Sequence, residues 1–200
     1  RVSITLAVRW LIPALERFKR AHPKVRIRVE TTHYVDFPLD GHTDIAITYR
    51  RSSEHEASQD REGELLLRDF SRPVLSPTLL AQSAYENRGH VANVPALKCS
   101  ENNWDWKLWT ERVGLDASAL VFADEFDTDD SALRAAAAGL GMVLATPLHI
   151  EAEMKSGALV ELPDAPAVEV GGFYLLTSPN QSKAVRQFRS WLHQEFDQAG

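Results

Sequence analysis

The chain has 200 residues, of which 44% are hydrophobic and 25% are charged, and this balance is typical of a soluble globular protein. No apolar run approaches the roughly 20 residues that cross a bilayer, and the first residues hold no recognisable signal peptide because Arg9 interrupts their short apolar run. The net charge of -6 argues against a nucleic-acid-binding surface on this chain. The chain begins without an initiator methionine, which is consistent with a fragment.

The first quarter of the chain reads as strand, helix, strand, connection and strand, a pattern typical of a parallel sheet with helices packed on it. The helix is predicted over residues 9–21. Leu11, Leu15 and Phe18 recur there at helical spacing, and Pro23 ends the pattern. The strands are predicted over residues 2–7, 25–30 and 44–49, the second of them from the strict alternation in VRIRVE.

After a polar loop over residues 50–63, an extended segment to Ser76, a short helix and a polar connection over residues 84–94, a second α/β block of similar size begins. Strands are predicted over residues 96–99, 120–123, 142–145, 158–163 and 171–179. Helices are predicted near 77, over 104–113, 129–138 and 147–155, and after the N-cap Ser182. The extended segments near 72–76 and 163–171 read as crossings between the blocks, and two crossings predict a discontinuous first lobe and a cleft between the lobes.

The stretch EFDTDDSALRAAAAGLGMVLATP, residues 125–147, is predicted to carry a binding edge. Asp127 or Thr128 can cap the helix that follows, and Asp129 suits its dipole. These residues follow a strand, where open α/β sheets bind ligands. The alternative is a well-capped helix with no ligand.

Arg9 lies at the equivalent junction of the first block, within LAVRW. Its planar guanidinium could bind a carboxylate, and the alternative is a solvated or salt-bridged arginine.

We find no positive sign of catalysis, and we predict neither a metal site nor a cofactor. Gly139-Leu-Gly141 ends a helix and opens a strand, which is the reverse of a dinucleotide fingerprint. The seven histidines show no metal-ligand spacing, and no Gly-x-Ser-x-Gly or HExxH motif is present. Cys99 is the only cysteine, so a reducing, cytoplasmic compartment fits, and we interpret this residue as a buried, inert thiol.

The chain resembles the effector-binding (regulatory) domain of LysR-type transcriptional regulators. The matching segments run nearly from end to end: RWLIPALERFKRAHPKVRIRV, GHTDIAITYR, RPVLSPTLL, WKLW, FDTDDSALRAAAAGLGMVLATP, SGALVEL and FRSWLHQEF. RWLIPAL and FDTDDSAL are typical of the branch that contains the glycine-cleavage, D-serine and β-lactamase regulators.

The resemblance implies an α/β fold of two Rossmann-like lobes joined by two crossover strands, which is periplasmic-binding-protein-like (type 2). Lobe I would comprise residues 1–73 and 170–200, and lobe II residues 74–169. The family also implies a winged helix-turn-helix domain that is absent from this chain and carries the contact with DNA. Family members form homodimers, typically antiparallel, and are often tetramers when full length.

The resemblance also places effector contacts, residue by residue. They fall on Ala7, Val8, Arg9, Thr32, Asp36, Tyr49, Asp127, Thr128, Asp129, Thr146, Phe173 and Tyr174. Val8 departs from relatives that carry a hydroxyl residue there. We therefore expect a non-enzymatic, ligand-sensing domain of a bacterial DNA-binding transcriptional regulator, with an amino-acid-like effector as one candidate. The alternative is a solute-binding receptor of a transporter, which shares the two-lobe design.

Overall fold

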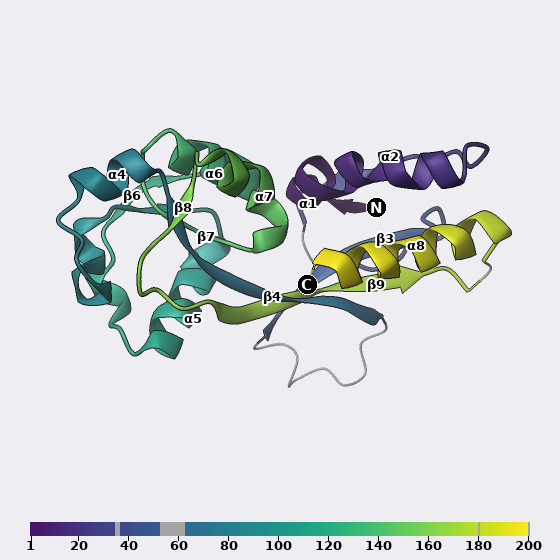
Figure 1. The fold of residues 1–200 in the computed structure, drawn as a ribbon. Helices are drawn as coiled ribbons and strands as arrows, with labels where there is room; N and C mark the ends of the chain where they lie inside the picture. The colour runs from purple at the N-terminus through teal and green to yellow at the C-terminus, as the bar shows by residue number, and fades with distance from the viewer. Residues whose placement is uncertain (35–36, 53–62, 180, 200) are drawn as a thin grey trace. The chain divides into compact units, whose positions relative to one another are not determined.

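A computed structural model describes residues 1–34, 37–52, 63–179 and 181–199. The chain forms two compact units, one from Arg1–Asp69 with Gly171–Gly200 and one from Phe70–Val170. The long strands β4 (Glu64–Leu75) and β9 (Val168–Thr177) each contain residues of both units (Figure 1). No helix in the described ranges has the length and apolar character needed to span a membrane.

Unit 1 is built on a mixed sheet whose strand order is β2 (Thr31–Thr32), β1 (Val2–Ser3), β3 (Ile45–Arg51) and β9. Strand β1 runs parallel to both β2 and β3, whereas β3 and β9 are antiparallel. The helices α2 (Ile12–Ala21) and α8 (Lys183–Ala199) pack on each other in this unit (Figure 1). The ring of Phe18 meets those of Phe188 and Trp191 at 5.0 and 5.2 Å, so aromatic packing joins the two helices.

The beginning of the chain corrects the sequence analysis, because the strand predicted over residues 2–7 ends at Ser3. The Ser3 hydroxyl accepts a hydrogen bond from the backbone N–H of Leu6 at 3.4 Å and caps a helix there. This helix, α1 (Ile4–Leu6), continues through a π-helical turn, η1 (Ala7–Leu11), into α2. The prediction of a helix start at Arg9 is therefore also wrong. A short apolar run fits a strand and a buried helix equally well by periodicity.

The segment over residues 25–30 alternates as predicted but forms no strand. Val25, Ile27 and Val29 are half-buried, whereas Arg26 and Arg28 are exposed. Only Thr31 and Thr32, directly after it, pair with β1. The predicted alternation of half-buried and exposed side chains is confirmed. The prediction that residues 25–30 form a strand is wrong.

Unit 2 combines antiparallel and parallel strand pairs. Strands β7 (Val143–Ala145) and β8 (Val160–Glu161) are antiparallel to β4. Strand β5 (Ala96–Lys98) is parallel to β6 (Phe122–Glu125), and Ala96 also forms a parallel bridge with Met142. The strand predicted over 120–123 corresponds to β6, which begins only at Phe122. The helices of this unit are α4 (Pro77–Gln82), η2 (Arg88–Asn93), η3 (Glu101–Asn103), α5 (Trp104–Val113), η4 (Ala117–Ala119), α6 (Asp129–Ala137) and α7 (Pro147–Ser156), and the α-helices agree closely with the predicted ones.

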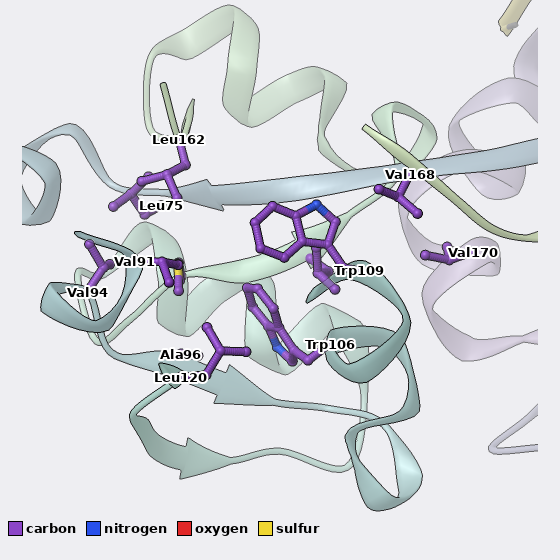
Figure 2. Packing of buried hydrophobic residues seen from close by; sticks show 12 residues of the cluster. Leu75, Val91, Val94, Ala96, Trp106, Trp109, Leu120, Leu162, Val168 and Val170 are labelled. Atoms are coloured by element: carbon purple, nitrogen blue, oxygen red, sulfur yellow. The ribbon is translucent and has the colours of Figure 1, made fainter. Parts of the chain in front are cut away.

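Two tryptophans of α5 lie at the centre of the unit 2 core (Figure 2). Trp106 and Trp109 are fully buried, and their rings meet edge to face at 5.9 Å. Each indole N–H donates to a backbone carbonyl at 3.0 Å, Trp106 to Leu97 and Trp109 to Pro166. The polar atoms of both rings are thus satisfied, and α5 is tied to β5 and to the segment before β9.

Glycine is required at two positions after α6. Gly139 has φ +88°, a left-handed conformation that ends the helix. A Cβ at Gly141 would lie 2.7 Å from the carbonyl oxygen of Pro95 and 2.8 Å from the side chain of Leu97. The chain therefore approaches β5 more closely than any other residue would allow.

The Gly141→Ala substitution is expected to lower the free energy of unfolding by about 1–3 kcal/mol, because a methyl group here overpacks against backbone. Urea unfolding would measure the loss. Gly41→Ala is the matched control, since a Cβ at Gly41 meets nothing within 4 Å. Equal stability of the two variants would contradict the close approach at Gly141.

Cys99 is expected to react slowly in the folded chain. Its side chain packs against the second apolar cluster of unit 2, and burial, followed by the charges of Asp129 and Asp105, raises the pKa of its thiol well above the usual value. The thiolate fraction falls about tenfold for each unit by which the pKa rises. Labelling with a thiol reagent at pH 8 should therefore be at least roughly tenfold slower in the folded chain than in urea. Equal rates would show that the thiol is accessible and ionised normally.

Candidate functional site

Three chain segments of unit 2 end at one edge because β5, β6 and the segment from Met142 run parallel. The backbone N–H of Phe126 donates to the carbonyl of Lys98 at 2.8 Å, which aligns the ends of β6 and β5. Asp127 and Thr146 follow two of these segments, as predicted from the sequence. The carboxyl ends of parallel strands are where open α/β sheets bind ligands.

The N-terminus of α6 forms the centre of this edge. The Thr128 hydroxyl accepts from the backbone N–H of Ser131 at 3.3 Å and lies 2.8 Å from the Ser131 hydroxyl. Thr128 is thus the N-cap, which confirms one of the two capping residues proposed from the sequence. Asp127 is exposed and Asp129 is half-buried, and both add negative charge where the helix dipole is positive.

Thr146 follows β7 and directly precedes α7. It is buried, and its carbonyl accepts from the backbone N–H of His149 at 3.0 Å. Its hydroxyl makes no capping bond, in contrast with that of Thr128. The structure therefore brings Asp127, Thr128, Asp129 and Thr146 to the same edge of unit 2.

The loop after β5 belongs to this edge as well, and the sequence analysis did not identify it. Asn102 and Asn103 are both left-handed, with φ of 54° and 53°, which is uncommon outside glycine although asparagine tolerates it best. The carboxylate of Asp105 bonds to the Ser100 hydroxyl and accepts from the backbone N–H of Trp106 at 2.8 Å. The available signal was the polar run SENN between a strand and a helix, the same order of elements as at Asp127.

The first helix of unit 1 carries three predicted contacts, which lie on the π-helical turn η1. The backbone N–H of Ile12 donates to the carbonyl of Ala7, five residues earlier. Ala7 is fully buried, Val8 is 44% exposed and Arg9 is half-buried, so solvent reaches the side chains of Val8 and Arg9. Turns of this kind are rare in helices and frequently occur at functional sites.

Thr32 lies beside this helix start, because it pairs with Ser3 in the register of β1 and β2. Its hydroxyl accepts from the backbone N–H of Tyr34 at 3.1 Å. Asp36, another predicted contact, lies outside the described residues.

The contacts predicted on β3 and β9 lie on two opposite faces of the sheet. Tyr49 and Phe173 are paired across the strands, and their rings meet at 5.1 Å. Phe173 is buried and packs against Phe196 of α8, while the Tyr49 hydroxyl donates to Asp69 at 2.9 Å.

Tyr174 lies on the opposite face of β9, because successive side chains of a strand alternate. The Arg50 guanidinium stacks over its ring at 4.5 Å from the centroid. Phe173 and Tyr174 therefore do not lie on one surface of unit 1.

A cavity of about 700 Å³ also lies within unit 1, and none of the predicted contacts among the described residues lines it. In the ranges that the structure describes, no group of three or more His, Cys, Asp or Glu side chains could hold a metal ion. Among the predicted contacts, unit 2 supplies hydroxyl groups and carboxylates, and unit 1 supplies the guanidinium of Arg9.

Comparisons with known proteins identify the family of the chain. The family model described as LysR substrate binding domain matches residues 1–197. The chain is 32% identical over 197 residues to the HTH-type transcriptional activator AmpR of Pseudomonas aeruginosa, covering 94% of this chain and 62% of that protein. It is 25% identical over 190 residues to the glycine cleavage system transcriptional activator of Escherichia coli, covering 94% and 61%. The chain thus spans about three fifths of the length of these relatives.

Solved structures give the same result. The effector domain of AmpR of Pseudomonas aeruginosa superposes with a TM-score of 0.79 at 25% identity, covering 98% of this chain and 93% of that chain. The AmpR effector binding domain from Citrobacter freundii gives a TM-score of 0.78 at 26% identity, covering 98% and 96%.

The predicted α/β, periplasmic-binding-protein-like (type 2) fold is confirmed, and so is the resemblance on which it rested. From the match over residues 1–197 and the likeness to solved effector domains, the chain belongs to the LysR substrate-binding domain family.

Proposed function

We propose that this chain is the effector-sensing domain of a bacterial LysR-type transcriptional regulator. The observation that carries the proposal is the family match over residues 1–197, together with relatives that are transcriptional activators. The chain spans about three fifths of those relatives, and a winged helix-turn-helix in the remaining part would contact DNA. The domain itself is non-enzymatic and cytoplasmic in this proposal.

The effector is a small molecule held in a cleft between two lobes, residues 1–73 with 170–200 and residues 74–169. The proposed contacts are Ala7, Val8, Arg9, Thr32, Asp36, Tyr49, Asp127, Thr128, Asp129, Thr146, Phe173 and Tyr174. The exposed or half-buried members, Val8, Arg9 and Asp127 above all, are supported best by accessibility. Ala7 and Phe173 are supported least, because both side chains are buried in unit 1.

The charges of the two units suit a zwitterion such as an amino acid. Arg9 supplies a planar guanidinium that can bind a carboxylate by two parallel hydrogen bonds. Asp127 and Asp129 supply carboxylates for an ammonium group, and the cap of Thr128 fixes the backbone between them.

Binding acts by population shift, because an effector that prefers one lobe arrangement stabilises it by its difference in affinity. In a homodimer, and in a tetramer of the full-length protein, that shift changes oligomer geometry and so the placement of the DNA-binding domains. A solute-binding receptor of a transporter is the alternative with the same fold. An export signal ahead of this domain, in place of a helix-turn-helix, would favour that alternative.

Thermal unfolding with amino acids, short peptides and aromatic acids tests the proposal first. A ligand at a hundred times its dissociation constant adds about 2.7 kcal/mol of stability. For a domain of this size that corresponds to a Tm increase of roughly 5–10 °C. A shift with amino acids alone supports the zwitterion, whereas a shift with aromatic acids alone supports sensing and rejects the zwitterion. No shift with any class would contradict a sensing role.

Arg9→Ala is expected to weaken the binding of a carboxylate effector roughly tenfold or more, because a hydrogen bond to a charged group contributes about 1.5–3 kcal/mol. Isothermal titration would measure the Kd. Arg20→Ala is the matched control, since Arg20 is an exposed arginine further along the same helix that pairs with Glu16. An unchanged Kd in Arg9→Ala would reject the proposed role of Arg9.

Asp127→Asn is expected to weaken the binding of an amino acid by a similar factor and to leave the binding of the matching deaminated acid unchanged. Only the amino acid has an ammonium group, so only its binding depends on the Asp127 carboxylate. Asp124→Asn, an exposed carboxylate on β6, is the control. Equal losses of affinity for the amino acid and for the deaminated acid would show that Asp127 does not act on the ammonium group.

A further inference from the structure

Strands β3, β9 and β4 are neighbours in the sheet, and β9 lies between the other two (Figure 1). We call β4 and β9 the crossover strands, because each contains residues of both units. The boundary residues of unit 1 on them are Asp69 on β4 and Gly171 on β9. A side chain that holds both residues fixes the point up to which each crossover strand belongs to unit 1. Tyr49 of β3 contacts both.

The hydroxyl group of Tyr49 reaches across β9 to β4. It donates a hydrogen bond to the carboxylate of Asp69 at 2.9 Å. Asp69 is only 5% exposed, and a buried carboxylate is costly unless hydrogen bonds replace the water that it has lost. Hydrogen bonds to charged groups are also stronger than those between neutral groups. The bond from Tyr49 is therefore a strong restraint on the end of β4 within unit 1.

The same side chain lies against the backbone of β9 at Gly171. A Cβ at Gly171 would lie 2.6 Å from the hydroxyl oxygen of Tyr49 and 2.3 Å from the carbonyl oxygen of Arg50. Only glycine leaves room for the Tyr49 ring at this position. The ring of Phe173, two residues further along β9, meets the Tyr49 ring at 5.1 Å. Tyr49 is thus bordered by β9 through both a backbone segment and a side chain.

Gly172 continues this close approach on the side of β4. A Cβ at Gly172 would lie 3.0 Å from the carbonyl oxygen of Leu67 and 3.0 Å from the side chain of Leu65. Leu65 and Leu67 both belong to β4. The two successive glycines therefore let β9 lie unusually close to β3 at one residue and to β4 at the next.

We propose that Tyr49 is a positioning residue that clamps both crossover strands at the boundary of unit 1, β4 through Asp69 and β9 through Gly171. The clamp makes the strands part of the rigid body of unit 1 up to these two residues. Its consequence for sensing rests on the proposed function, in which Tyr49 is an effector contact. An effector that binds the Tyr49 hydroxyl then acts on both crossover strands at once.

The alternative is that Tyr49 is only an aromatic residue of the core. Phenylalanine would then serve equally well, because packing against Phe173 and Gly171 does not use the hydroxyl group. The bond from that hydroxyl to a buried carboxylate favours the clamp. The two interpretations differ in what the removal of one oxygen atom does.

Hydrogen exchange of the Tyr49→Phe chain, without any ligand, tests the clamp. We expect exchange to become roughly tenfold or more faster in fragments covering residues 64–69 and 171–175, because the lost bond restrains both strand ends. Fragments of α2, which lies in the same unit, should change little. Tyr34→Phe is the matched control, since it removes the same oxygen from a tyrosine that is 76% exposed and should leave all fragments unchanged.

A second variant tests the partner of Tyr49. Asp69→Ala should give the same local acceleration, and adding Tyr49→Phe to it should cause no further change, because the bond is already lost. Unchanged exchange in Tyr49→Phe, acceleration in only one of the two strands, a uniform increase throughout unit 1, or additive effects of the two substitutions would overturn the proposal. None of these results bears on the thermal-shift test, so failure of the clamp is distinguishable from failure of the proposed function.

Discussion

The need to satisfy the first backbone N–H groups of each helix fixes the backbone at the places where the candidate contacts lie. Four helices begin with a serine or threonine whose hydroxyl accepts from the N–H three residues later: Ser3, Ser76, Thr128 and Ser182. Ser3 is the last residue of the parallel strand β1, and Thr128 lies shortly after the end of the parallel strand β6. The capped turn fixes the backbone there, and the neighbouring side chains become the candidates for ligand contact.

Each unit has its own apolar core. In unit 1 the core includes the aromatic rings between α2 and α8, and Trp10 of the π-helical turn meets Phe196 at 4.1 Å. Unit 2 has Trp106 and Trp109 at its centre, with their N–H groups bonded to backbone carbonyls (Figure 2). Each unit therefore has its own buried aromatic core.

The predicted contacts in unit 1 and those in unit 2 differ in how well the sequence placed them. In unit 2 the pattern of strand, short polar residues and alanine-rich helix was strong enough to identify Thr128 and its neighbours correctly as a helix start. In unit 1 the apolar run ITLA concealed a helix start, so Arg9 was assigned to the wrong position in its helix. The loop at Ser100 was missed because its signal is an unremarkable polar run, and its left-handed asparagines emerge only from the backbone.

The sequence by itself determined the α/β class, most helices of the second unit and the family, because these depend on local periodicity, capping residues and a nearly end-to-end motif match. Only the tertiary structure decided which segments pair and which side chains share a surface. The alternation in residues 25–30 predicted which side chains are half-buried, but it could not decide whether the segment pairs as a strand. Likewise, Phe173 and Tyr174 are adjacent in sequence yet lie on opposite faces, because the pleat of a strand turns neighbouring side chains apart.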